Sequence, residues 1–174
     1  TRVWVSVVGI ASIFFGSKGY ADTVISVADF GLKPDTRENA VAYVQKAIEA
    51  CRGKEPVTLV FPEGRYDFWP QYAHEKNYYE TNTYDVFPKR LAMLFEGLHN
   101  ITVDGNGSQF VMHDRIQPIT VENCDGVTLK NFSIDWDIPL TAQARVTKVG
   151  SDFFEIEINV LESPYIIEDE LQDR

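Results

Sequence analysis

An internal repeat constrains the fold of this chain more than any other feature of the sequence. Residues 94–103, which read LFEGLHNITV, can be laid over residues 120–129, which read TVENCDGVTL, with a constant offset of 26 residues. The aligned pairs are Phe95 with Val121, Glu96 with Glu122, Leu98 with Cys124, Ile101 with Val127, Thr102 with Thr128, and Phe110 with Trp136. A period of about 20–50 residues is typical of solenoid proteins.

The repeat unit has the pattern of strands and turns. Short runs of alternating apolar and polar residues are separated by Asn, Asp or Gly. A helical repeat would instead carry one longer apolar stripe with helical spacing. A single unit cannot bury its own apolar face, whereas stacked units bury a continuous core with strands about 4.8 Å apart. The repeat therefore predicts a mainly β fold, a parallel β-helix.

The charge of the chain restricts its partners. The formal net charge is −10 and the isoelectric point is near 4.7. This acidity argues against nucleic acid and anionic membrane surfaces, and it favours an uncharged sugar over a polyanion unless a cation intervenes. Cys51 and Cys124 are predicted to be buried free thiols, with a disulfide as the alternative. The sequence contains no Cys/His spacing for a metal site, no catalytic triad and no phosphate loop.

The first 21 residues have the features of a secretory signal peptide. An apolar run over residues 3–15 follows Arg2, and Gly19 and Ala21 supply small residues at the −3 and −1 positions of a cleavage site. The run is too short to span a bilayer. We therefore expect a signal peptide without its first residues, cleaved after about Ala21, and a secreted or periplasmic protein. The alternative is a buried first strand.

Two strands are predicted, over residues 24–27 and 57–61. An amphipathic helix is predicted between them. Its apolar positions are Val41, Val44, Ile48 and Cys51, and Gly53 follows at the expected C-terminal cap. Asp35 lies three residues before Glu38, which is a capping-box pattern with Asp35 as the N-terminal cap. Because the open end of a solenoid exposes its core, we expect this helix to cover it.

Residues 67–90 form a long segment with seven aromatic side chains and no sustained period. Long connections are usually functional or disordered, and the high aromatic content argues against disorder. Aromatic faces can stack on the C–H face of a sugar, which makes Trp69, Tyr72, Tyr78 and Tyr79 candidate sugar contacts. The alternative is that they pack the segment against the helix.

Two carboxylates in residues 134–140 are the second set of candidate site residues. In a strand Asp135 and Asp137 point to one face, opposite to Trp136, with Cα atoms about 6.6 Å apart. Inverting glycosidases hold two carboxyl groups roughly 6.5–9.5 Å apart. Sugar binding, Ca²⁺ binding and an ordinary solvated face are the alternatives to proton transfer. His113, Asp114 and Arg115 suit a polar cluster, in which Asp114 and Arg115 form an ion pair or Arg115 contacts sugar hydroxyls.

The end of the chain changes in character. Residues 143–149 and 153–160 alternate apolar and polar residues around a turn at residues 150–152, which predicts a β-hairpin. An antiparallel hairpin does not belong to a parallel coil. We therefore divide the chain into a signal peptide (1–21), the N-terminal part of a β-helix domain (22–140) and the start of an inserted antiparallel β domain (141–174).

Longer motifs resemble known families. Residues 27–36 (VADFGLKPDT) and 60–68 (VFPEGRYDF) are similar to the N-terminal motif of the pectate-lyase-like superfamily, which implies a right-handed β-helix. Four segments resemble glycoside hydrolase family 110, whose members are bacterial exo-α-1,3-galactosidases, including enzymes that remove galactose from the blood group B antigen. These segments are residues 61–72 (FPEGRYDFWPQY), 78–82 (YYETN), 113–118 (HDRIQP) and 134–144 (IDWDIPLTAQA).

The second resemblance implies hydrolysis with inversion by paired carboxylates, without a cofactor, on a galactose-terminated glycan. It also implies that the catalytic acids lie beyond Arg174, so that this segment alone is inactive. Trp69, Arg115, Asp135 and Asp137 are then predicted to contact the sugar or support the site. The alternatives are another β-helix polysaccharidase, such as a pectin-active enzyme, or a non-catalytic carbohydrate-binding β-helix protein.

Overall fold

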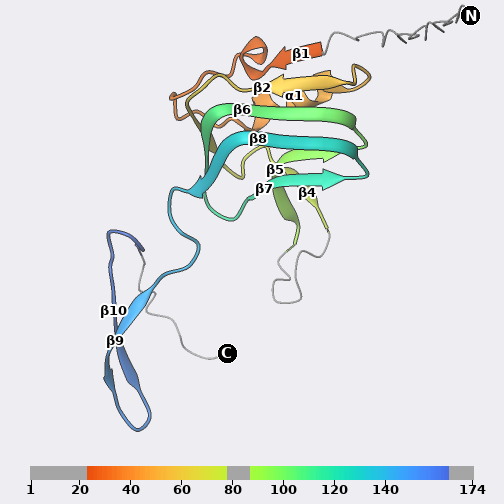
Figure 1. The fold of residues 1–174 in the computed structure, drawn as a ribbon. Coiled ribbons are helices and arrows are strands. Elements are labelled where there is room, and N and C mark those ends of the chain that lie inside the picture. Colours follow the sequence, from red (N-terminus) through yellow and green to blue (C-terminus); the bar gives the residue numbers. More distant parts are fainter. Residues whose placement is uncertain (1–22, 78–86, 165–174) are drawn as a thin grey trace, which may run out of the picture.

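The computed structural model describes residues 23–77 and 87–164 of the chain, and shows a mainly β fold with parallel sheets (Figure 1). The predicted signal peptide and the candidate residues Tyr78 and Tyr79 lie outside the described residues. The elements are β1 (Thr23–Ser26), the 3-10 helix η1 (Val27–Phe30), α1 (Val41–Cys51), β2 (Val57–Val60), β3 (Arg65–Phe68), β4 (His74–Lys76), β5 (Lys89–Glu96), β6 (His99–Met112), β7 (Gln117–Glu122), β8 (Asp125–Trp136), β9 (Ala144–Val149) and β10 (Phe154–Ile158).

The long strand β6 is the centre of the larger sheet. Its first part pairs in parallel with β2, which in turn pairs with β1, and its second part pairs in parallel with β3. Strand β8 pairs in parallel along the other side of β6, so that β1, β2, β6 and β8 follow one another as a stack (Figure 1). Ile101 faces Val127 and Thr102 faces Thr128, as the repeat predicts.

A second sheet repeats the same stacking. Strand β5 pairs in parallel with β7, and Phe95 faces Val121 while Glu96 faces Glu122. The offset of 26 residues therefore holds in both sheets, and each repeat unit contributes one strand to each sheet. Strand β4 adds to the outer side of β5 in the antiparallel direction. The predicted pairing of the two repeat units is confirmed.

The predicted alignment of Phe110 with Trp136 is wrong. The register between β6 and β8 shifts by two residues after Asp104, so that Phe110 faces Ile134 and Met112 faces Trp136. The cause is a bend at residues 105–107 of β6, where Asn106 and Gly107 adopt positive φ angles of 50° and 83°. Between two successive pairs, β6 advances by four residues (Asp104 to Ser108) while β8 advances by two (Lys130 to Phe132). After the bend, the paired residues are therefore 24 positions apart in the sequence instead of 26.

The turns of the two repeat units place Asn and Gly at equivalent positions. Gly97 in the first unit corresponds to Asn123 in the second, and Asn100 corresponds to Gly126. All four have positive φ angles, between 49° and 67°. Only Gly, and less often Asn, adopts this left-handed conformation at low cost. The exchange of Asn for Gly therefore preserves the same turn in successive units.

Helix α1 confirms the predicted span but not its predicted cap. Val41, Val44, Ile48 and Cys51 are all buried, and Gly53 follows the helix with a φ of 74°. Asp35 does not cap the helix; its carboxylate accepts a hydrogen bond from the backbone N–H of Arg65 at 2.9 Å. The segment before the helix runs beside β3, where the backbone N–H groups of Asp35 and Ala40 donate to the Arg65 and Asp67 carbonyls. This pairing directs Asp35 away from the helix.

One hydrophobic core joins the sheets and the helix. Helix α1 packs against η1, β1, β2 and β5, and its buried residues belong to the same core as Phe95, Leu98 and Ile101. At the other side of the core, Phe110 contacts four aromatic rings at centroid distances of 4.8–6.1 Å, those of Phe61, Tyr66, Phe68 and Phe132. The helix thus covers apolar surface of the strands.

The predicted hairpin is confirmed. Strands β9 and β10 pair only with each other among the described residues, in the antiparallel direction, and Figure 1 shows them well separated from the stacked strands. Cys51 and Cys124 are free, as predicted. Cys51 is also fully buried, as predicted, whereas Cys124 is only partly buried. Within the two described ranges, no helix has the length and apolar character needed to cross a membrane.

Candidate functional site

Three polar or aromatic side chains lie in a row where β3, β6 and β8 end. Phe68 pairs with Met112, and Met112 pairs with Trp136. The residues that follow these three are Trp69, His113 and Asp137. The backbone N–H of His113 donates to the Phe68 carbonyl at 2.9 Å, and that of Asp137 donates to the Met112 carbonyl at 3.0 Å. Stacking of the strands therefore brings together residues that are distant in sequence.

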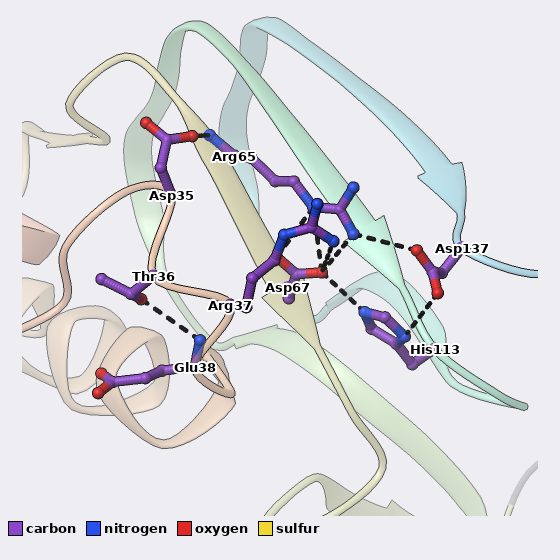
Figure 2. A network of polar contacts seen from close by, with 8 residues as sticks. All are labelled: Asp35, Thr36, Arg37, Glu38, Arg65, Asp67, His113 and Asp137. Carbon is purple, nitrogen blue, oxygen red and sulfur yellow. Dashed lines mark hydrogen bonds and ion pairs between the residues drawn. The ribbon is translucent and has the colours of Figure 1, made fainter.

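A buried carboxylate, that of Asp67, forms the centre of this site (Figure 2). Its side chain is 1% exposed. Arg65 donates to it through Nε at 3.0 Å and Nη2 at 2.6 Å, and His113 Nε2 lies 2.8 Å from Oδ1. Arg37 adds a longer ion pair at 4.0 Å. A buried charge is tolerated when it is paired and hydrogen-bonded in this way.

Asp137 connects the same groups to solvent. Its Oδ1 accepts a hydrogen bond from Arg65 Nη2 at 3.1 Å, and its Oδ2 lies 3.7 Å from His113 Nδ1. The side chain of Asp137 is 43% exposed, whereas that of His113 is 13% exposed. Figure 2 shows Asp137 reaching toward Arg65 and His113 from the end of β8. The site thus consists of an inner and an outer carboxylate with Arg65 and His113 between them.

The Trp69 indole covers one face of the His113 ring. The two rings are stacked, with centroids 3.8 Å apart and planes inclined by 6°. The backbone of Trp69 is held by Asn39, whose Oδ1 accepts from the Trp69 N–H at 3.2 Å and also from the Val41 N–H at 3.1 Å. Asn39 Nδ2 donates to the Gln71 carbonyl at 2.8 Å. One amide therefore fixes both the start of α1 and the position of Trp69.

Electrostatics keep the network ionised. Burial acts to raise the pKa of Asp67, but hydrogen bonds from Arg65 and His113 outweigh it and hold that pKa below its usual range. The hydrogen bond to Asp67 also raises the pKa of Arg65, with a further contribution from Asp137. Asp67 is therefore a carboxylate at neutral pH and acts only as an acceptor.

The structure brings together two of the four predicted site residues. Trp69 and Asp137 belong to the row described above. Asp135 is exposed, and its carboxylate accepts a hydrogen bond from the backbone N–H of Trp136 at 2.8 Å. Arg115 is exposed and has no hydrogen bond or ion pair with another described residue. Trp136 faces the core, opposite to the two aspartates, as strand alternation predicts.

The predicted ion pair between Asp114 and Arg115 does not form. Asp114 has a positive φ of 56°, and its backbone carbonyl accepts from the indole N–H of Trp136 at 3.3 Å. Tyr72 is 75% exposed, with a φ of 68°, and its backbone carbonyl accepts a hydrogen bond from the Gln45 side chain of α1.

Sequence reasoning did not identify Arg65, Asp67 or Asn39 as part of a site. Along β3, Arg65 and Asp67 alternate with the core residues Tyr66 and Phe68. This alternation is the only signal in the sequence that marks them. Their partner His113 lies beside Trp69 because β3 pairs with the residues of β6 that come 44 positions later in the chain. No repeat in the sequence has this offset. Among the residues that the structure describes, no group of three or more His, Cys, Asp or Glu side chains could hold a metal ion.

Comparison with known proteins adds to this geometry. No protein-family model matches the chain. The chain is similar to part of several α-1,3-galactosidases. It is 62% identical over 148 residues to α-1,3-galactosidase B of Bacteroides thetaiotaomicron, a match that covers 85% of this chain and 24% of that protein. It is 37% identical over 136 residues to α-1,3-galactosidase A of Shewanella woodyi, covering 78% of this chain and 22% of the relative.

A third relative, an α-1,3-galactosidase B of Phocaeicola vulgatus, is 36% identical over 159 residues, which are 89% of this chain and 25% of that protein. The chain thus spans about a quarter of the length of the curated relatives it matches. All three matches carry the name of a glycosidase that acts on α-1,3-linked galactose. They agree with the resemblance that the motifs around Trp69 and Trp136 indicate.

Proposed function

We propose that the whole protein to which this chain belongs is a secreted glycoside hydrolase of family 110. It removes terminal α-1,3-linked galactose from neutral glycans of the blood group B type, with inversion. The observation that carries the proposal is the 62% identity to α-1,3-galactosidase B of Bacteroides thetaiotaomicron. The acidic composition is consistent with an uncharged substrate, because it would repel a polyanion.

The proposed architecture extends the stacking of the described strands. Residues 22–140 are the N-terminal part of a right-handed parallel β-helix with α1 at its end, in the pectate-lyase-like superfamily. Residues 141–174 begin an inserted antiparallel β domain, and residues 1–21 are a signal peptide. The parallel pairing of β5 with β7 and of β6 with β8 supports the first assignment, and the β9–β10 hairpin supports the second.

In the proposed reaction, one carboxylic acid protonates the leaving oxygen and one carboxylate activates a water on the opposite face of the sugar. The two catalytic groups lie beyond Arg174, and the reaction uses no cofactor or metal. This segment contributes sugar contacts or support for the site. Trp69 and Asp137 do so through the row at the ends of β3, β6 and β8, and Asp135 and Arg115 do so from the exposed surface beside it.

The test compares linkages with the full-length protein. Methyl glycosides or oligosaccharides that end in α-1,3-linked and α-1,4-linked galactose are offered at equal concentration, and galactose release is measured. We expect release from the 1,3 linkage, with β-galactose as the first anomer seen by NMR. Preference for the 1,4 linkage, or cleavage of neither, would exclude the proposal. Binding of sugars without release would favour a carbohydrate-binding protein, and release of uronides from pectin would favour a polysaccharidase.

The 174-residue segment alone provides a separate test. Because the catalytic carboxylates are proposed to lie beyond it, the segment should release no galactose under conditions in which the full-length protein is active. Turnover by the purified segment would contradict the placement of the catalytic groups, while leaving the substrate assignment intact.

A further inference from the structure

His113, which follows β6, joins two carboxylates and an indole that come from the ends of two other strands, Asp67 and Trp69 from β3 and Asp137 from β8. We propose that His113 is a positioning residue, which holds the Asp137 carboxylate and the Trp69 indole as one preformed surface for an uncharged sugar. The identity of the ligand rests on the proposed function, whereas the link between His113, Trp69 and Asp137 rests on geometry alone. The imidazole lies 2.8 Å from Asp67 Oδ1, 3.7 Å from Asp137 Oδ2 and stacks on Trp69 at 3.8 Å.

The direction of the hydrogen bonds follows from the inner carboxylate. Because Asp67 is an ionised acceptor, His113 Nε2 carries a proton and donates it to Asp67. His113 Nδ1 faces Asp137 Oδ2 at 3.7 Å, which is too long for a hydrogen bond. Both atoms therefore remain available to hydroxyl groups placed beside them. Sugars supply such hydroxyl groups in pairs on neighbouring carbons.

The charges around His113 favour a neutral ligand. The charged groups that face it are Asp67 on β3 and Asp137 after β8. Arg65 pairs with both carboxylates, and Arg37 lies 4.0 Å from Asp67. Both guanidinium groups thus have carboxylate partners within this cluster. An anionic sugar would meet the exposed Asp137 carboxylate without an uncompensated cation, so an uncharged ring with hydroxyl donors is the better fit.

Each partner of His113 restricts a different degree of freedom. The hydrogen bond to Asp67 fixes the tautomer and the orientation of the imidazole. Many functional histidines are held in the same way, by a carboxylate that accepts from one ring nitrogen. Stacking fixes the plane of the Trp69 ring, and Asn39 fixes its backbone. Asp137 is held on one oxygen by Arg65, which leaves Oδ2 directed toward His113. Binding sites in which a few polar groups are fixed beside an aromatic surface lose little entropy when a ligand binds.

The experiment uses the full-length protein and two substitutions of His113. His113→Phe keeps a ring that can stack on Trp69 but removes both nitrogen atoms, and His113→Gln keeps a donor for Asp67 but removes the ring. His99→Gln is the matched control, since His99 is an exposed histidine on β6. KM and kcat are measured with the α-1,3-linked galactoside, together with the quenching of tryptophan emission by acrylamide, because the imidazole covers one face of the Trp69 indole.

We expect KM to rise about tenfold in both His113 variants, with kcat changed less than about twofold, because the surface is needed for binding the sugar and does not enter the reaction. Acrylamide should quench tryptophan emission equally in the unsubstituted protein and in His99→Gln. Quenching should increase in His113→Gln, which uncovers the indole, and this increase should be absent when Trp69→Phe is added, a substitution used only to assign the signal. If His113→Phe does not fold, as judged by circular dichroism, His113→Gln decides the result.

Two results would overturn the inference. The first is an unchanged KM in a folded His113 variant of an active enzyme. The second is acrylamide quenching that does not increase in His113→Gln. If the unsubstituted protein releases no galactose, the proposed function fails instead, and the quenching measurement still decides whether His113 contacts Trp69 in solution.

Discussion

Replacement of the buried carboxylate by an amide, Asp67→Asn, should loosen the ends of β3, β6 and β8 without unfolding the protein. The amide can accept one hydrogen bond, but it loses the bidentate charged contact with Arg65 and the charged contact with His113. Removing one partner of a buried ion pair costs about 3–5 kcal/mol. The Arg65 side chain is 22% exposed and keeps its ion pair with Asp137, so the substitution does not leave it without a partner. We therefore expect a smaller loss of stability, about 2–3 kcal/mol.

The assay is hydrogen exchange measured by mass spectrometry, because a protein of several units does not unfold in two states. The amide of His113 donates to the Phe68 carbonyl, and the amide of Asp137 donates to the Met112 carbonyl, so both report on the network. Peptides that contain these amides should lose about 30- to 150-fold in protection in Asp67→Asn. Glu155→Gln removes the exposed pair with Lys148 and serves as the control, with a change below about 0.5 kcal/mol.

The same variant tests the pH dependence of the network. The pKa of Asp67 is lowered in the folded protein, so its contribution to stability is present above the usual carboxyl pKa and is lost as the pH falls below it. Protection at His113 and Asp137, corrected for intrinsic exchange, should therefore fall below about pH 4 in the unsubstituted protein. That fall should be much smaller in Asp67→Asn. Equal protection in the variant and in the control at neutral pH would refute the central role of Asp67.

Two further predictions concern residues outside the site. Burial raises the pKa of the Cys51 thiol to about 11. Cys51 should therefore resist iodoacetamide at pH 8 in the native protein and react only after denaturation. Mass spectrometry of the labelled peptide measures the extent of the reaction. Gly126→Ala should destabilise the second repeat unit by about 1–2 kcal/mol, because Gly126 has a φ of 67° and its new Cβ would lie 2.6 Å from Asn100 Oδ1. Gly53→Ala is the comparison, since no atom lies within 4 Å of its Cβ position, and hydrogen exchange measures the loss of protection in both variants. An equal loss would show that conformation alone sets the cost.

The sequence predicts the stacking of the strands because the relevant signal is local and repeated. Apolar alternation and the exchange of Gly97 for Asn123 mark equivalent strands and turns, and the structure pairs them in parallel. The helix is predicted equally well from its buried face. Its cap is not predicted, because the segment before the helix runs beside β3, a tertiary contact in which the Asp35 carboxylate accepts from the Arg65 N–H.

The candidate site is predicted less completely, for a related reason. Trp69 and Asp137 are recognisable as residue types that suit a sugar. Asp67, which binds their common neighbour His113, is not recognisable, because it is buried by segments that are distant in sequence. A carboxylate between Tyr66 and Phe68 has the ordinary appearance of a solvated strand position. Only the pairing of β3 with β6 shows that it meets His113 instead of water.

The two-residue shift between β6 and β8 decides which side chain completes the row. With the constant offset of 26 residues, His113 would lie beside Pro139, which has neither charge nor a side-chain acceptor. The bend at residues 105–107 shortens the offset to 24, which places Asp137 beside His113 and Trp136 beside Met112. A shift by an even number of residues preserves the inward and outward faces, so the core tolerates it. The irregularity in the repeat is therefore the feature that brings the second carboxylate to the site, while the regular part of the repeat builds the scaffold that holds it.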